Sequence, residues 1–504
     1  MKLPWLPLCL SPLLGVVATL GFAPYGLWPL TIVALAVLLF LARGATAWRA
    51  ALLGWLFGIA NFASGIYWIF ISTHVYGAAP AWLSITLCTL LFSYMALYPA
   101  LAIGLAARWR LLDGPSAWFG VPALWILGEM LRGWVGSGFP WLLLGYIWTD
   151  TPFEKLAPLM GVHGLSAVVM LSALALLHLV RGVGVRRLLP AAALSLLAIA
   201  SAGLGADLWT QPTGTPLSVA IVQGNVPQDE KWNSEHLNDI VRRYREMALQ
   251  ALGTQLIVWP ETALPYPLAA MEGPFLEDLD ARLRHGGSTL LMGVLIVEEP
   301  DVGKRRLSNS AITVGDQRSR YDKRHLVPFG EYFPIPDFLR PLMDVLGTPY
   351  SDFSSGPATQ GPMEVAGRRL YVNICFEDVF ASEFRRDARN ADILVNLTND
   401  AWFGDSSAPH QHLQISRMRA LETGRWLVRS ANTGISAVID ADGRLVARSD
   451  QFRTETLRAE VPSRRGSTPY DRYGDVPLWL LSAVVVAGLS RRRSKPGETK
   501  HDRA

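Results

Sequence analysis

The chain has 504 residues, half of them hydrophobic, and its mean hydropathy is positive, which excludes an ordinary soluble enzyme of this length. The small net charge of +4, without a basic stripe interleaved with aromatic residues, gives no sign of a nucleic-acid partner. Four of the 42 acidic residues lie in the segment 1–205, so we predict an apolar membrane part followed by a globular part of ordinary composition.

Eight apolar stretches predict membrane spans, because about 20 mostly apolar residues cross a bilayer. Their approximate limits are 8–23, 28–42, 51–71, 81–106, 116–133, 158–180, 188–205 and 476–490. The first is not expected to be a cleaved signal peptide, since no small-residue cleavage site follows it. The predicted organisation is a membrane domain of seven spans (1–205), a second domain (206–475), an eighth span (476–490) and a basic tail (491–504).

Basic residues in the short loops predict the orientation of these spans, since such residues favour the cytoplasmic side. They gather in alternate loops and in the tail: Arg43, Arg49, Arg108, Arg110, Arg181, Arg186, Arg187, Arg491, Arg492, Arg493, Lys495, Lys500 and Arg503. The loops on the other side of the membrane carry only two basic residues, Arg132 and Lys155. We therefore expect both termini in the cytoplasm and residues 206–475 on the outer face, which is the periplasm in a bacterium with two membranes.

Two features near the outer end of the fifth predicted span have alternative interpretations. Glu129 and Arg132 lie three residues apart and are either functional or, as we expect, a local ion pair. The segment 137–149 is rich in Gly, Pro and aromatic residues, and it forms either an interfacial belt with turns or the lining of a lipid entry site.

The segment after the seventh span predicts a layered α/β domain, in which strands alternate with helices. Thr213 to Pro216 are expected to form a linker. Runs of apolar and β-branched residues predict strands at 218–224, 255–259, 288–297, 308–314, 369–375, 392–397 and 435–440, and helical spacing predicts a helix at 234–252. Asp442-Gly443 predicts a hairpin turn, and the Gly-, Ser-, Pro- and Thr-rich segment 343–362 predicts a mobile loop.

Cys375 is the candidate nucleophile. Cys9 and Cys88 fall in predicted spans, so Cys375 has no disulfide partner in the outer domain. It ends the apolar strand 369–375, and a sharp turn there exposes the sulfur and frees backbone N–H groups to bind an oxyanion. The alternative is a small buried apolar residue.

Two further segments place charged residues at the ends of apolar strands. Glu261 follows Leu256 to Pro260, and Lys323 lies among aromatic and apolar residues in 320–334. A carboxylate that takes the thiol proton and an ammonium group that stabilises the oxyanion complete a workable thiolate site. Together the three residues indicate acyl chemistry.

These motifs resemble a known family. The outer domain is similar to the nitrilase (carbon–nitrogen hydrolase) superfamily, and the whole chain resembles its membrane-embedded branch, the apolipoprotein N-acyltransferases. The matching segments occur in family order: Gly138 to Leu142, Trp259 to Pro265, Lys323 to Glu331, Cys375 to Glu377, Asn396 to Gly404, Pro409 to His412, Arg419 to Glu422 and Asn432 to Gly434. The resemblance implies an α-β-β-α sandwich, set in a bundle of eight spans in the bacterial inner membrane.

The resemblance also implies roles for individual residues. Glu261 is implied as general base, Lys323 as oxyanion stabiliser and Cys375 as nucleophile. The supporting residues implied are Glu331 beside the lysine, the N–H of Phe376 in the oxyanion site, Glu377 just after the nucleophile, and Trp232 for substrate binding. Tyrosine is frequent at position 376 in the family, so a role for that hydroxyl is in doubt here. For Asn399, Asp400, His410 and His412 we expect scaffold hydrogen bonding.

The implied reaction is ping-pong. Cys375 takes the sn-1 acyl chain of a phospholipid, with phosphatidylethanolamine the expected donor, and passes it from a thioester to the α-amine of the diacylglyceryl-cysteine of an apolipoprotein. No cofactor and no metal are expected. The alternatives are a membrane-tethered nitrilase-type amidase with water as acceptor, and a transporter or assembly factor with a non-catalytic domain.

Overall fold

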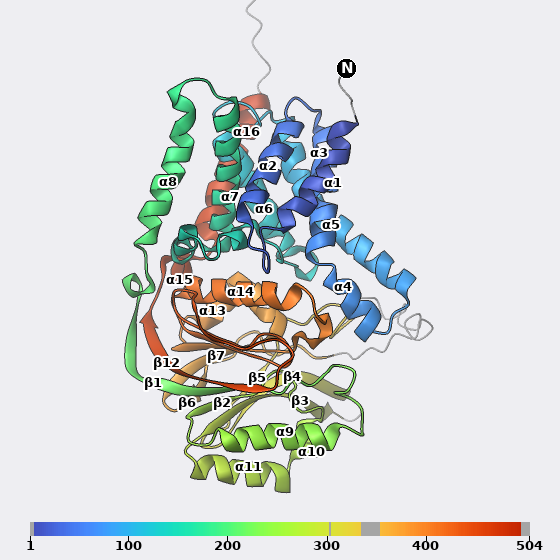
Figure 1. Ribbon diagram of the computed structural model, residues 1–504, viewed down its shortest axis with the longest axis vertical. Helices are drawn as coiled ribbons and strands as arrows, with labels where there is room; N and C mark the ends of the chain where they lie inside the picture. Colours follow the sequence, from blue (N-terminus) through green and yellow to red (C-terminus); the bar gives the residue numbers. More distant parts are fainter. Residues whose placement is uncertain (1–4, 302–303, 334–352, 495–504) are drawn as a thin grey trace, which may run out of the picture.

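The structure is a computed structural model that describes residues 5–301, 304–333 and 353–494, and a helical bundle stands on an α/β domain in it (Figure 1). The helices of the bundle are α1 (Leu6–Thr19), α2 (Trp28–Ala42), α3 (Ala47–Gly65), α4 (Trp68–Phe70), α5 (Ala81–Arg108), α6 (Ala117–Arg132), α7 (Ala157–Arg181), α8 (Leu189–Ala202) and α16 (Val476–Ser494). A helix therefore lies at each of the eight predicted apolar stretches.

Length and apolar composition support fewer than eight spans. Within the described residues, Ala81–Arg108, Pro152–Arg181 and Val185–Ala202 are long and apolar enough to cross a membrane, and the bent pair Ala47–Gly65 and Trp68–Tyr76 makes a fourth if it is one span. Leu6–Thr19, Trp28–Ala42 and Val476–Ser490 are apolar but shorter. At 1.5 Å per residue, a helix of about 15 residues is shorter than the hydrocarbon core of about 30 Å.

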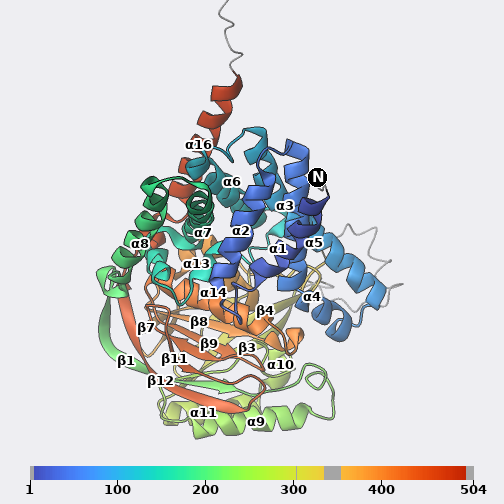
Figure 2. The same cartoon turned by 45° about the horizontal axis from the view of Figure 1, so that its top comes forward.

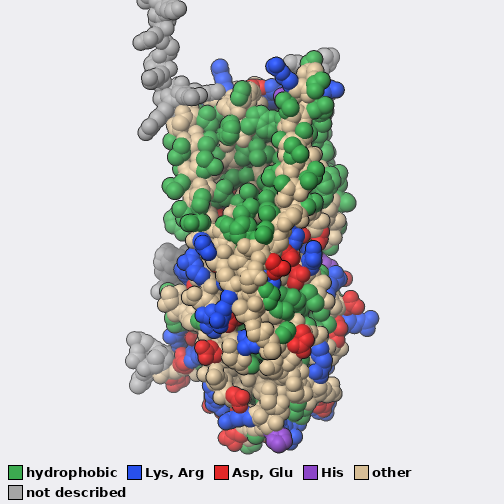
Figure 3. All heavy atoms as spheres, turned by 90° about the vertical axis from the view of Figure 1, so that its left-hand side faces the viewer, with side chains coloured by type: hydrophobic (Ala, Val, Ile, Leu, Met, Phe, Trp, Pro, Cys, Tyr) green, Lys and Arg blue, Asp and Glu red, His purple; other side chains and the backbone are tan. Residues whose placement is uncertain are grey.

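The outside of the bundle is apolar. On the face seen in Figure 3, hydrophobic side chains form a broad band over the bundle, whereas most acidic and basic side chains cover the α/β domain. Large apolar residues of the bundle, such as Trp82, Leu90 and Phe119, are exposed. Helix α16 returns from the α/β domain along the bundle (Figure 2), where Val486 and Leu489 pack against its core. Such a surface is suited to lipid rather than to water.

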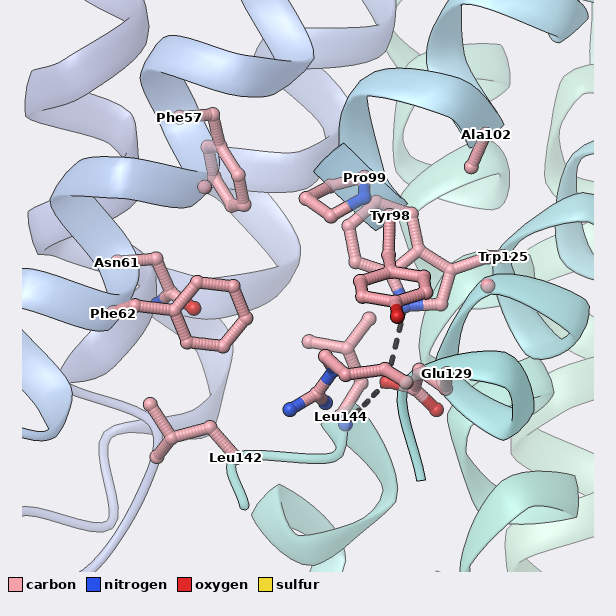
Figure 4. Close-up of a pocket in the computed structure, with 13 residues that line it drawn as sticks. Phe57, Asn61, Phe62, Tyr98, Pro99, Ala102, Trp125, Glu129, Leu142 and Leu144 are labelled. Atoms are coloured by element: carbon pink, nitrogen blue, oxygen red, sulfur yellow. Dashed lines mark hydrogen bonds between the residues drawn. The ribbon is translucent and has the colours of Figure 1, made fainter. Parts of the chain in front are cut away.

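The expected ion pair between Glu129 and Arg132 is not formed, and this prediction was wrong. Glu129 Oε1 accepts hydrogen bonds from Trp125 Nε1 at 3.1 Å and from the Leu144 N–H at 2.9 Å (Figure 4). Arg132 instead donates to the carbonyls of Phe139 and Trp141 at 2.9 and 2.6 Å. Both side chains bind the backbone of the loop that follows α6, because buried loop N–H and C=O groups need partners.

The α/β domain contains, among the described residues, two six-stranded sheets. The first has the order β12-β1-β2-β3-β4-β5, with β1 (Thr210–Gln223), β2 (Leu256–Val258), β3 (Thr289–Asp301), β4 (Lys304–Val314), β5 (Arg320–Asp322) and β12 (Glu455–Gly466). The second has the order β11-β10-β9-β8-β7-β6, with β6 (Met363–Val365), β7 (Arg368–Ile374), β8 (Ile393–Thr398), β9 (Leu427–Ala431), β10 (Ala437–Ile439) and β11 (Leu445–Arg448).

The two sheets pack face to face, with helices on both outer faces. Apolar residues of both sheets, such as Val219, Val258 and Val395, share one core cluster between them. Helices α9 (Leu237–Gln250), α10 (Leu268–Met271) and α11 (Pro274–His285) lie on the first sheet, and α13 (Ala381–Ala388) and α14 (Ala408–Thr423) lie on the second (Figure 1). A short helix α15 (Pro469–Tyr473) precedes α16. The predicted α-β-β-α sandwich is confirmed.

The strands predicted from β-branched runs occur in the structure, as do the helix at 234–252 and the hairpin at Gly443, whose φ is +76°. The predicted linker is wrong. Thr213 to Pro216 lie inside β1, where the register against β12 shifts between Thr213 and Leu217. Gly and Pro interrupt regular strand pairing, so a bulge that contains them has the same sequence pattern as a linker. The first part of the predicted loop, 343–352, lies outside the described residues.

Helix α14 joins the domain to the bundle. It lies on the second sheet, and its residues Ile415, Met418 and Leu421 belong to the core cluster of the bundle. Gln411, which is buried, accepts hydrogen bonds at Oε1 from Trp141 Nε1 (2.7 Å) and Trp68 Nε1 (3.2 Å). Its Nε2 donates to the Gly65 carbonyl at 2.9 Å. One side chain therefore links α14 to the end of α3, to α4 and to the loop after α6.

We expect Gln411→Leu to lower the free energy of unfolding by at least about 2 kcal/mol, because three buried polar groups lose their partner. Thermal unfolding of the detergent-solubilised protein measures this change. Gln317→Leu, on an exposed turn, is the control and should leave the midpoint unchanged. An unaltered midpoint in Gln411→Leu would show that the link contributes nothing to stability.

Candidate active site

The three candidate catalytic residues follow the carboxyl ends of strands. Glu261 comes shortly after β2 and Lys323 directly after β5, and these strands run in the same direction in the first sheet. Cys375 comes directly after β7 of the second sheet. Because the two sheets face each other, the structure brings these three side chains to one edge of the sandwich.

Cys375 lies at a sharp turn from strand to helix, as predicted. Its φ is +53°, a left-handed conformation that is uncommon for a residue with a side chain. It begins the 3₁₀ helix Cys375–Val379, in which Phe376 is the second residue. N–H groups in the first turn of a helix have no partner within it. The Phe376 N–H is therefore available to a ligand beside the sulfur.

Lys323 lies between two carboxylates. Its ammonium nitrogen is 2.8 Å from Glu331 Oε1 and 3.5 Å from Glu261 Oε1, and its side chain is only 1% exposed. Glu331 also accepts a hydrogen bond from the Val327 N–H at Oε2 (2.8 Å), which closes the loop 327–331 around the lysine. Glu331 therefore lies directly beside the lysine and pairs with its ammonium group.

Glu261 is held by Asn309, which sequence reasoning missed, and by Asn399, for which scaffold hydrogen bonding was expected. Asn309 Nδ2 donates to Glu261 Oε1 at 2.7 Å and to Glu331 Oε1 at 3.0 Å, and the Asn399 N–H donates to Glu261 Oε2 at 2.9 Å. Asn309 lies in the middle of β4, between Ser308 and Ser310 and just before the mostly apolar segment Ala311 to Val314. A lone amide in a buried strand requires a polar partner, and this was the signal available in the sequence.

The electrostatics of the site favour a charged lysine and a neutral thiol. Burial disfavours the ammonium form of Lys323, but Glu331 and Glu261 outweigh burial, so its pKa lies above its usual value. Burial and the charge of Glu261 raise the pKa of Cys375 well above its usual value, against the opposite effects of Lys323 and the Thr398 hydroxyl. The resting thiol therefore needs a base to take its proton as it attacks.

Glu377 and Trp232 do not join Glu261 and Lys323 around the thiol of Cys375. Buried Glu377 accepts hydrogen bonds from the Ile374 N–H (2.7 Å) and from the N–H groups of Arg324 (2.8 Å) and His325 (3.1 Å). It therefore ties the segment after Lys323 to the turn at Cys375 and is a structural support. Trp232 is 52% exposed, on an irregular segment before α9.

The loop after α6 lies against the nucleophile turn. The ring of Phe376 stacks on Phe139 and Trp141, with ring centroids 5.7 and 6.4 Å away. A cleft beside this stack is lined by Ser137, Arg324, His325, Leu326, Tyr332, Phe353 and Ser355. The bundle therefore contributes one wall of the site, which makes 137–149 more than an interfacial belt.

Comparisons with known proteins agree with this architecture. The family described as "Apolipoprotein N-acyltransferase N-terminal domain" matches residues 14–175, and "Carbon-nitrogen hydrolase" matches residues 218–470. The chain is 42% identical to an apolipoprotein N-acyltransferase of Ralstonia nicotianae, over 96% of this chain and 93% of that protein. It is 40% identical to the proteins of that name from Methylococcus capsulatus (95% of each chain) and Nitrosomonas europaea (95% of this chain, 97% of that one).

We expect Gly293→Ala to lower the free energy of unfolding by about 1–3 kcal/mol. A Cβ at Gly293 would lie 2.6 Å from Glu261 Cα and from Thr262 N, so the backbone that carries the carboxylate must shift. Thermal unfolding checks the change in stability. Gly361→Ala is the matched control, because no atom lies within 4 Å of its added Cβ; equal midpoints for the two variants would contradict the prediction.

We expect alkylation of Cys375 by iodoacetamide to accelerate about tenfold for each pH unit up to at least pH 9, because the raised pKa leaves the thiolate scarce at neutral pH. Mass spectrometry of the Cys375 peptide measures the rate separately from Cys9 and Cys88. Glu261→Gln removes a charge that raises this pKa, so alkylation at pH 8 should become faster in that variant. A rate that levels off near pH 7 would show a preformed thiolate.

Proposed function

The chain belongs to the apolipoprotein N-acyltransferase family, and from this premise we propose that Cys375 carries the acyl chain that this enzyme transfers. The acyl donor is a membrane phospholipid, with phosphatidylethanolamine as the proposed head group. The acceptor is the α-amine of the diacylglyceryl-cysteine at the N-terminus of an apolipoprotein. The product is an N-acylated lipoprotein.

One observation carries this proposal: the nucleophile turn lies directly under the loop of the apolar bundle. Phe376, next to Cys375, stacks on Phe139 and Trp141 of that loop. Moving an acyl chain out of the bilayer costs about 0.8 kcal/mol per methylene. A thiol at the junction of bundle and domain can react with an ester carbonyl while the acyl chain stays in an apolar phase. A water-soluble amide substrate has no need of this placement.

In the first half-reaction, Glu261 takes the proton of the Cys375 thiol as the sulfur attacks the sn-1 ester carbonyl. The negative charge on the carbonyl oxygen is stabilised by the Lys323 ammonium and the Phe376 N–H. The ester C–O bond then breaks, and the proton on Glu261 passes to the departing glycerol oxygen. A lysophospholipid leaves, and the acyl group stays on Cys375 as a thioester.

In the second half-reaction, the α-amine of the acceptor attacks the thioester carbonyl and Glu261 takes a proton from the amine. The C–S bond breaks, and the proton passes to the Cys375 sulfur, which restores the thiol. Glu331 keeps Lys323 in place throughout, and Glu377 keeps the turn in place. We assign Trp232, a half-exposed aromatic residue, to substrate binding.

We further propose that all eight apolar helices cross the bacterial inner membrane, with both termini cytoplasmic and the α/β domain periplasmic. The helices of 14 to 16 residues reach across only with flanking residues or local thinning of the bilayer. The basic loops at Arg43, Arg108 and Arg186 support this orientation. The domains are then 1–205, 206–475, 476–490 and the tail 491–504, of which 495–504 lie outside the described residues.

We expect the purified protein, incubated with phosphatidylethanolamine and no acceptor, to gain the mass of one fatty acyl group that hydroxylamine removes. Cys375→Ala should gain none, and Glu261→Gln should gain it at least about a hundredfold more slowly, since general base catalysis contributes about 10²–10⁴. Intact-protein mass spectrometry measures the adduct.

Adding a diacylglyceryl-cysteine peptide should discharge the adduct and yield the N-acyl peptide, whereas the same peptide with an acetylated amine should not. Release of free fatty acid at the same rate with either peptide would support a hydrolase instead. Wild-type protein that gains no mass while the lipid stays intact would overturn the proposal.

A further inference from the structure

A buried cluster of four charged side chains lies beside the turn that carries Cys375. Its members are Asp378, Asp400, His412 and Arg429, each 1% exposed or less. They come from the 3₁₀ helix Cys375–Val379, from the turn after β8, from α14 and from β9. Two carboxylates face two cationic groups, so the cluster is electrically balanced in the interior. The mechanism above uses none of them.

The hydrogen bonds of His412 determine its protonation. Nδ1 lies 2.9 Å from Asp400 Oδ1 and Nε2 lies 2.9 Å from Asp378 Oδ1. An ionised carboxylate only accepts hydrogen bonds, and a neutral imidazole has one N–H. Both nitrogens must donate to satisfy both carboxylates, so the ring is an imidazolium with a fixed orientation.

His412 also contacts the nucleophile turn itself. Its Nε2 lies 3.3 Å from the carbonyl oxygen of Cys375, and Asn396 Nδ2 donates to the same oxygen at 3.3 Å. Asn396 is anchored by Arg429, whose guanidinium donates to its Oδ1 at 2.7 Å. The Asn396 amide and the His412 Nε2–H, which is shared with Asp378, therefore hold one carbonyl group.

This carbonyl belongs to the same peptide unit as the Phe376 N–H. A peptide unit is planar and trans, so its C=O and N–H point in opposite directions. Donors that fix the direction of the C=O therefore fix the direction of the N–H. At Cys375 this matters because the left-handed φ of +53° gives the turn little local preference for its conformation.

We propose that His412 is a positioning residue, which holds the Cys375–Phe376 peptide so that the Phe376 N–H points at the oxyanion formed on the acyl carbonyl. The inference rests on the proposed function, since it assigns to His412 a part in acylation. His412 does not touch the substrate and does not take a proton from the thiol.

The surroundings of the imidazole support this role. Burial and Arg429 lower its pKa, but Asp378 and Asp400 outweigh them and raise it to about 9. The ring of Trp141, from the bundle loop, packs against it at a tilted angle, with ring centroids 5.7 Å apart. His412 therefore keeps its charge and both of its donors at neutral pH, and loses a proton only as the pH rises through about 9.

The test compares two reactions of Cys375 in His412→Gln. Acylation by phosphatidylethanolamine develops an oxyanion, whereas alkylation by iodoacetamide displaces iodide at carbon and develops none. We expect single-turnover acylation to slow at least about tenfold, since the loss of one oxyanion donor costs about 10²–10³ and a misdirected donor costs less. Alkylation should change by less than about twofold.

His410→Gln, the same substitution on the same helix, is the control and should leave both rates unchanged. If His412→Gln does not fold, the isosteric Asp400→Asn replaces it, because that variant removes one of the two carboxylates that orient the imidazolium. It should slow the absolute rate of acylation by about three- to tenfold without slowing alkylation, since it removes a charge that raises the pKa of Cys375.

Each outcome has one meaning. If His412→Gln slows acylation but leaves the alkylation rate unchanged, the result supports the role of His412. Equal slowing of both reactions overturns it, because a general disturbance of the turn affects the thiol itself. Wild-type acylation rates in both His412→Gln and Asp400→Asn overturn it as well, and leave the proposed function intact. Wild-type protein that forms no acyl adduct overturns the proposed function and this inference with it.

Discussion

The buried ammonium group of Lys323 is the constraint on which the rest of the site depends. An unpaired charge in a protein interior costs several kcal/mol, so the ammonium group requires carboxylates beside it. Glu331 arrives from the loop directly after the lysine, and Glu261 arrives from the end of β2. Asn309 donates to both carboxylates. The order of strands in the first sheet is therefore coupled to the charge balance of the site.

The surroundings of Cys375 also keep its thiol neutral at rest. Burial and the negative charge of Glu261 disfavour a resting thiolate at Cys375 more than Lys323 favours it, so the pKa of the thiol lies well above its usual value. A thiol with a raised pKa is mostly neutral at neutral pH and needs a base to take its proton as the sulfur attacks. Such a site is protected against oxidation, because the thiolate is the form of cysteine that oxidants attack.

Helix α14 packs the bundle firmly against the α/β domain. Helix α14 packs on the second sheet with one face, through Leu413 and Ala420, and against the bundle with the other, through Ile415 and Met418. This double burial explains why α14 shows no single apolar stripe, which a helix with one wet face would show. The bundle is therefore part of the catalytic architecture as well as an anchor.

The sequence by itself determined the two-part organisation, the strands that carry Glu261, Lys323 and Cys375, and the family. Apolar runs, β-branched segments and motif spacing are local features, and local features follow from the chain alone. Two predictions from the sequence were wrong because the structure of these segments depends on residues far away in the chain. Gly and Pro in 213–216 read as a linker but form a bulge in β1, and Glu129 and Arg132 hold the backbone of a loop instead of each other.

Only the tertiary structure decided which polar residues share the site. Asn309, Asp378, Asn396 and Arg429 lie on separate elements, and nothing in their spacing indicates that they meet around Lys323 and Cys375. His412 was expected to belong to the scaffold, and its contact with the Cys375 carbonyl became visible only once α14 was packed on the second sheet. Hydrogen-bond partners across sheets are set by how layers pack, because a buried polar group takes the partner that folding brings to it.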